Sequence, residues 1–138
     1  MMMTKDGPLA VVLLAVASGA AIGACLRWAL SYWLNARWGV MPLGTLAANW
    51  LGAFAIGMTT AWLLSHQDVT PVLRLFLVTG LMGGLTTFST FSAESLALLN
   101  TGAYARALLH TGMHLFGSIL LCAAGMQAFR LFNSLGSS

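Results

Sequence analysis

The sequence predicts an all-α membrane protein with four transmembrane helices per subunit, the third of them broken at the middle of the membrane. Hydrophobic residues make up 59% of the chain and charged residues only 7%, which lies far outside the composition of soluble proteins. The mean hydropathy is +0.86. Four apolar segments each supply the roughly 20 helical residues that cross a hydrocarbon core of about 30 Å. With 138 residues, the chain has room for a single four-helix domain spanning its whole length.

The first apolar segment predicts a helix over about residues 8–34. It is too long for the core of a signal peptide, so we interpret it as a retained helix. Ala15, Gly19 and Gly23 follow at steps of four and form a ridge of small residues that lets a second helix approach closely. Arg27 either reaches the membrane surface or lines a vestibule that concentrates anions. Around it, aromatic side chains predict an interfacial belt: Trp28, Tyr32, Trp33 and Trp38.

The other three helices are predicted over about residues 43–64, 71–99 and 103–132. Short loops join them, including a turn at Arg37–Gly39, so sequential antiparallel helices are the simplest topology. The third segment has 29 residues and would be about 43 Å long as one unbroken helix. A break near its centre removes the excess length.

The stretch from Gly80 to Glu94 carries the signal for this break. Gly83 and Gly84 each weaken a helix by roughly 1 kcal/mol relative to alanine, and the serines and threonines that follow offer the backbone competing hydrogen bonds. A helix interrupted at membrane depth is tolerated only where its backbone is buried in protein or lines a wet cavity. The stretch therefore predicts an ion or substrate site.

Two phenylalanines and one acidic residue are candidate functional side chains in this stretch. Phe88 and Phe91 lie three residues apart and share one side of the restarted helix. Aromatic rings have a positive edge, so two rings presented edge-on favour a small anion, although such a pair is also typical of a packed core. Glu94, one turn beyond, is either a functional intramembrane acid or a capping and packing residue.

Polar residues on the second and fourth helices extend the predicted site. Asn49 needs hydrogen-bonding partners deep in the membrane. It either forms a hydrogen bond between helices or donates to an ion from the pore wall. His110 and His114 have metal-ligand spacing, but no third ligand lies nearby in sequence, so a hydrogen-bonding track beside a pathway fits better. Either imidazole would make that track sensitive to pH. The track forms a polar stripe at steps of four: Arg106, His110, His114, Ser118 and Cys122.

The basic residues divide equally between the two sides of the predicted membrane protein, with Lys5, Arg74 and Arg130 on the side of both termini, against Arg27, Arg37 and Arg106. The positive-inside rule then favours neither orientation, which allows two copies to pair antiparallel about a twofold axis. The net charge of +3 is too sparse for a nucleic-acid face, so no nucleic-acid partner is expected. Cys25 and Cys122 lie in apolar segments, where we expect buried thiols and no disulfide.

Three motifs together resemble the Fluc (CrcB-type) fluoride channel family: Gly83-Gly84-Leu-Thr-Thr-Phe88-Ser-Thr-Phe91-Ser, Gly44-Thr45-Leu-x-x-Asn49-x-x-Gly52 and Arg27-Trp28. The likeness covers essentially the whole chain, in order and at matching spacings. It implies a dual-topology antiparallel homodimer in membrane lipid, with two fluoride pores along the subunit interface. It also implies passive, fluoride-selective export across a bacterial plasma membrane. A passive channel is sufficient for export, because fluoride enters as neutral HF, which dissociates inside the cell.

The resemblance implies roles for particular residues. Phe88 and Phe91 would contact fluoride with their ring edges. Asn49 would donate to the ion from the pore wall, and Glu94 would line the pathway beyond the rings. The other implied pore residues are polar side chains of the third and fourth helices: Thr87, Ser89, His110, His114 and Ser118.

A structural sodium ion at the dimer centre is implied as well, held by the backbone carbonyls of Gly83 and Thr86. Unwound carbonyls coordinate sodium in other membrane proteins. The fourth helix departs from the family, which typically has tyrosine and then serine where His110 and His114 stand. Ser118 matches a further serine. This departure bears on conductance and on its pH dependence.

Two other functions fit a small four-helix membrane protein. A proton-coupled multidrug exporter can also be a dual-topology dimer, but it requires an acid within a spanning helix. The first two helices have none, and Glu94 follows a motif that already has another explanation. A non-transporting assembly factor, held by glycine ridges, is the second alternative. No catalytic residues are predicted, and the protein is not expected to be an enzyme.

Overall fold

The computed structural model describes residues 2–35 and 42–136. It contains four helical segments that are each long and apolar enough to cross a membrane, which confirms the predicted four-helix architecture. They span Leu9–Asn35, Leu43–Ser65, Pro71–Asn100 and Tyr104–Gly136. The predicted turn at Arg37–Gly39, together with Trp38 of the aromatic belt, lies outside the described residues.

The first two segments are each one continuous helix, whereas the third and fourth are divided. Both divided segments contain a π-helical stretch, η1 in the third and η2 in the fourth. The elements follow in this order: β1 (Met3–Thr4), β2 (Gly7–Pro8), α1 (Leu9–Asn35), α2 (Leu43–Ser65), α3 (Pro71–Arg74), η1 (Leu75–Met82), α4 (Gly83–Leu85), α5 (Phe88–Asn100), α6 (Tyr104–Gly112), η2 (Met113–Gly117) and α7 (Ser118–Gly136).

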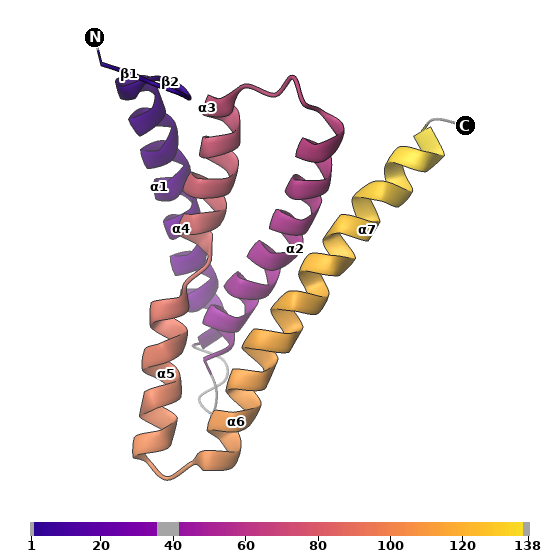
Figure 1. Ribbon diagram of the computed structural model, residues 1–138. Helices are drawn as coiled ribbons and strands as arrows, with labels where there is room; N and C mark the ends of the chain where they lie inside the picture. The colour runs from indigo at the N-terminus through magenta and orange to yellow at the C-terminus, as the bar shows by residue number, and fades with distance from the viewer. Residues whose placement is uncertain (1, 36–41, 137–138) are drawn as a thin grey trace.

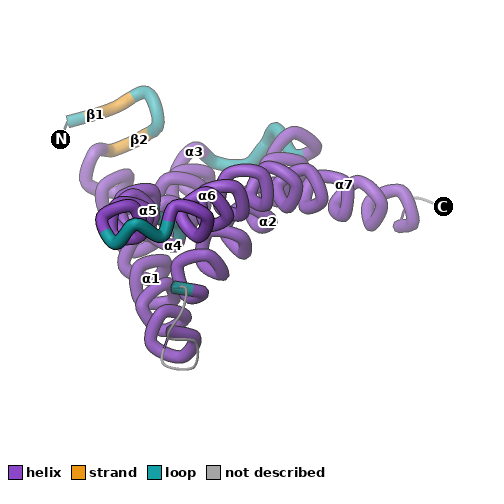
Figure 2. Tube along the Cα trace, turned by 90° about the horizontal axis from the view of Figure 1, so that it is seen from below, coloured by secondary structure: helices purple, strands orange, loops and turns teal. Residues whose placement is uncertain are grey.

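The four segments alternate in direction, so that both ends of the chain lie at the same end of the molecule (Figure 1). Helix α1 packs along η1 and α4, and α2 packs along α7. Seen from below, α7 projects beyond the other helices (Figure 2). The arrangement places α5 and α6 together at the opposite end from the termini.

The sequence analysis did not predict the π-helical stretches η1 and η2 or a short N-terminal hairpin. β1 pairs antiparallel with β2, and Thr4 Oγ1 donates to the Gly7 carbonyl at 2.8 Å. Gly7 has a φ of 131°, which only glycine adopts readily. Helix α1 then begins at Leu9, whose N–H donates to the Met2 carbonyl at 3.1 Å.

Small residues bring the helices into close contact. A Cβ atom on Gly23 would overlap the backbone of Leu81, and one on Gly84 would overlap the backbone of Ala20. The predicted small-residue ridge therefore packs against the third segment, as close-approach ridges do in membranes. Both cysteines are free, but Cys25 is exposed on the subunit. The expectation that it is buried was wrong, because it faces away from this ridge contact.

Candidate functional site

Helical geometry in the third segment stops at Leu85 and resumes at Phe88. The two residues between are extended, with φ and ψ of −86° and 155° at Thr86 and of −151° and 118° at Thr87. Thr87 caps the restarted helix, because its Oγ1 accepts from the backbone N–H of Thr90 at 3.2 Å. The glycines before this point and the hydroxyls after it explain why the chain leaves the helix here.

Asn49 of α2 supplies hydrogen-bonding partners to the interrupted backbone. Its Oδ1 accepts from the Thr87 N–H at 2.7 Å, and its Nδ2 donates to the Thr87 carbonyl at 3.1 Å. One amide side chain thus pairs with both backbone groups of the residue at the interruption. Nδ2 also lies 3.1 Å from Nδ1 of His114. Asn49 therefore joins the second, third and fourth segments.

Arg27 supports the same region from α1. Its Nε donates to the Gly84 carbonyl at 3.0 Å, just before the interruption. The side chain is half-buried and contacts the third segment. Arg27 thus has a structural partner in the subunit, beside the vestibule role that the sequence suggested.

The two phenylalanines lie beside each other at the start of α5. The ring centroids of Phe88 and Phe91 are 5.4 Å apart, with 55° between the ring planes. Phe88 is 79% exposed on the subunit, whereas Phe91 is half-buried. The Phe91 ring contacts the imidazoles of His110 and His114, at centroid distances of 5.5 Å and 4.7 Å.

A hollow of about 720 Å³ lies alongside the interruption. Helix α2, the third segment and the fourth segment all contribute to its wall. Eight of the predicted site residues line it: Asn49, Gly83, Thr86, Thr87, Phe88, Phe91, His114 and Ser118. The other four, Arg27, Ser89, Glu94 and His110, lie outside this lining. Ser89 is exposed, with its Oγ 3.2 Å from Thr87 Oγ1.

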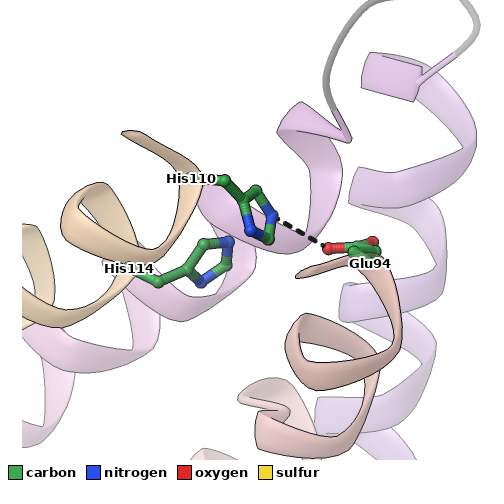
Figure 3. A group of neighbouring side chains, drawn as sticks. All are labelled: Glu94, His110 and His114. Carbon is green, nitrogen blue, oxygen red and sulfur yellow. Dashed lines mark ion pairs between the residues drawn. The ribbon is translucent and has the colours of Figure 1, made fainter. Parts of the chain in front are cut away.

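Glu94, His110 and His114 form a compact cluster (Figure 3). Thr45 Oγ1 donates to Glu94 Oε1 at 2.6 Å, and His110 Nε2 lies 3.3 Å from Glu94 Oε2. The two imidazole centroids are 4.5 Å apart. His110 is 1% exposed and His114 6%. One ligand atom from each of the three residues lies within 4.8 Å of the others, so the fold supplies the third potential metal ligand that sequence spacing alone did not reveal.

Ser95 is a site residue that the sequence analysis missed. Its Oγ lies 3.1 Å from His110 Nδ1, opposite the ring atom that faces Glu94. Ser95 follows Phe91 by four residues and Phe88 by seven, so it lies on the same helix face. That periodicity is the signal that would have identified it.

Comparison with known proteins supports one family for most of the chain. Residues 14–126 match the model of the CrcB-like protein, Camphor Resistance (CrcB) family. A "Fluoride-specific ion channel FluC" of Chromohalobacter salexigens is 48% identical over 124 residues, 90% of this chain and 94% of the relative. Proteins of the same name from Thiobacillus denitrificans and Cupriavidus pinatubonensis are 50% and 51% identical, covering 85% and 91% of this chain and 94% and 98% of those relatives.

Proposed function

The chain belongs to the CrcB-like protein family, and from this premise we propose that it is a fluoride-selective channel. It would export fluoride passively across the bacterial plasma membrane and so relieve fluoride toxicity. It is a multi-pass membrane protein of an ion-channel family, not an enzyme.

One observation carries the proposal: the helix interruption, two phenylalanines and several hydrogen-bond donors meet at one hollow. Ring edges of Phe88 and Phe91 offer positive electrostatic potential to a small anion, and Ser118 and His114 offer polar hydrogens. No lysine or arginine lines the hollow in the described part of the chain. Such a wall attracts fluoride without a fixed charge that would hold it, and conduction requires release as well as binding.

A second copy of the chain would complete the pathway. A bare ion in hydrocarbon costs tens of kcal/mol by Born reasoning, and one subunit leaves Phe88 79% exposed beside the hollow. The equal division of basic residues favours insertion in both orientations. We therefore propose an antiparallel homodimer in which two pores run along the interface, with rings from both copies beside each pore.

A structural sodium ion fits the interrupted backbone. In a continuous helix the carbonyls of Gly83 and Thr86 would accept from the N–H groups of Thr87 and Thr90. Those N–H groups donate instead to Asn49 Oδ1 and Thr87 Oγ1. Both carbonyls are thereby released from their usual helical donors, and carbonyl oxygen is the ligand type that sodium prefers at unwound helices. We propose that Gly83 and Thr86 of both copies bind this ion and join the subunits.

A proton-coupled multidrug exporter is the weaker candidate. Such a protein needs an acid that alternates between protons and a bulky substrate. Glu94 is instead held by Thr45 Oγ1 at 2.6 Å and lies 3.3 Å from His110 Nε2. Glu94 also lies outside the lining of the hollow, so the acid does not face the space in which a drug-sized cation would bind.

Expression of the chain in bacteria that lack their own fluoride exporter tests the proposed activity. We expect restored growth in fluoride-containing medium and a lower internal fluoride concentration, because passive efflux balances the entry of HF. Cells with an empty vector provide the control. Growth and internal fluoride equal to those of the control, with the protein present in the membrane, would refute export.

The antiparallel arrangement predicts two orientations in the membrane. Gln67 is exposed in the loop between α2 and α3, so a Gln67→Cys substitution in a Cys25→Ala, Cys122→Ala background places one reactive thiol per chain. A thiol reagent that cannot cross membranes should label about half of the chains in intact spheroplasts, since dual insertion divides them equally. Labelling of all chains, or of none until the membrane is permeabilised, would contradict the antiparallel dimer.

A further inference from the structure

Three buried side-chain atoms in the described part of the chain lack a hydrogen-bond partner, and all three belong to one cluster: Glu94 Oε2, His110 Nε2 and His114 Nε2. Figure 3 shows the two imidazoles of the fourth segment and the carboxylate of α5 turned toward a common space. Buried polar atoms without partners are unfavourable. Glu94 Oε2 and His110 Nε2 lie 3.3 Å apart and face each other, whereas His114 Nε2 faces neither a donor nor an acceptor within hydrogen-bond distance in the described part of the chain. A cation placed between the three atoms would pair with all of them.

We propose that Glu94, His110 and His114 bind a divalent transition-metal ion of the Zn²⁺ class. Two imidazoles and one carboxylate are a known zinc ligand set, which leaves one coordination position open. Zinc–ligand distances of about 2.0–2.2 Å place tetrahedral ligands roughly 3.3 Å apart. His110 Nε2 and Glu94 Oε2 are already separated by 3.3 Å. One ligand atom from each of the three residues lies within 4.8 Å of the other two, so small side-chain movements would complete a tetrahedral set.

Two of the three ligands are already oriented by neighbouring hydroxyls. Ser95 Oγ lies 3.1 Å from His110 Nδ1, and when Nδ1 carries the proton and donates to it, the lone pair of Nε2 faces the metal. Thr45 Oγ1 donates to Glu94 Oε1, which leaves Oε2 for coordination. Outer hydrogen bonds of this kind hold metal ligands in their binding orientation.

The third ligand connects the metal site to the helix interruption. Paired with both backbone groups of Thr87, the Asn49 amide has a fixed orientation, so that its NH₂ group faces His114 Nδ1. An NH₂ group only donates, and the neutral His114 ring therefore carries its proton on Nε2. Metal binding moves this proton to Nδ1 and breaks one hydrogen bond, which is far weaker than zinc coordination.

Binding at this cluster would also regulate the proposed channel. Phe91 contacts both imidazoles, at 5.5 Å and 4.7 Å between ring centroids, so the metal would place a positive charge beside the ring that is proposed to contact fluoride. A fixed charge there retains the anion and slows its release. This consequence rests on the proposed function, whereas metal binding itself does not.

Calorimetric titration of the purified, chelator-treated protein with zinc chloride tests the site. We expect one ion per chain, and an affinity at least tenfold lower in Glu94→Gln and His110→Gln. His66 is exposed and outside the cluster, so His66→Gln should bind zinc as the wild type does. Asn49→Asp should bind about tenfold more tightly, because a carboxylate accepts from the Nδ1–H of a metal-bound histidine.

Absence of zinc binding in the wild type would overturn the proposed site. Zinc affinities in Glu94→Gln and His110→Gln equal to that of the wild type would overturn it as well. Unchanged affinity in folded Asn49→Asp would remove His114 from the ligand set. In liposomes, zinc should slow fluoride efflux through the wild type but not through His110→Gln, each relative to its own zinc-free rate. Bound zinc with undiminished efflux would refute the regulatory role. A lack of efflux without zinc would refute the proposed channel while leaving the metal site standing.

Discussion

Replacing Phe91 by isoleucine should reduce fluoride efflux to the leak of protein-free liposomes. Isoleucine preserves an apolar side chain but has no ring edge, which is the group that carries positive potential toward the anion. Phe91 occupies a central position, since its ring lies 5.4 Å from that of Phe88 and 4.7 Å from that of His114. Loss of this ring removes the proposed anion contact in both copies of a dimer at once.

Phe132→Ile provides the matched control for this experiment. Phe132 is 72% exposed near the end of α7 and lies outside the hollow. We expect this variant to conduct as the wild type does, and both variants to elute as dimers from a sizing column in detergent. Efflux through Phe91→Ile at the wild-type rate would show that fluoride conduction does not require the ring edge of Phe91.

Replacing Asn49 by leucine should destabilise the protein by about 2–4 kcal/mol and abolish fluoride efflux. The substitution removes both hydrogen-bond partners of the Thr87 backbone, and each buried group left unpaired costs about 1–3 kcal/mol. The interruption would then lose the contact that fixes it to α2. Thermal unfolding in detergent, followed by circular dichroism, measures the loss of stability.

Asn133→Leu is the corresponding control, because Asn133 is exposed near the end of α7. Its unfolding temperature should remain within the scatter of the wild type. Equal unfolding temperatures for Asn49→Leu and the wild type would mean that the Thr87 backbone finds other partners. In that case, the interruption would not depend on α2.

The number of helices could be predicted because membrane thickness and apolar length determine it almost independently of tertiary contacts. The glycine pair and the hydroxyl run likewise indicated where the third segment leaves helical geometry, since both effects are local. The N-terminal hairpin could not be predicted, because its two strands have only two residues each. Such strands leave no periodic pattern in the sequence.

Contacts between distant residues were beyond the sequence analysis. Asn49 pairs with Thr87, 38 residues away, and nothing in the local pattern of α2 distinguishes this partner from a pore-side anion. The spacing of His110 and His114 suggested metal ligands, but Glu94 comes from another segment and approaches only through folding. The sequence also did not reveal that Phe88 is exposed on the subunit, because a phenylalanine at this position could equally have packed inside the helix bundle.

Fluoride efflux from proteoliposomes, read with a fluoride-selective electrode, tests the central proposal most directly. Vesicles loaded with fluoride and chloride should release fluoride down its gradient as soon as a potassium ionophore balances the charge, and they should retain chloride. The rate should not depend on a proton gradient. Release no faster than from empty vesicles, equal loss of chloride, or release only in exchange for protons would contradict a passive fluoride channel.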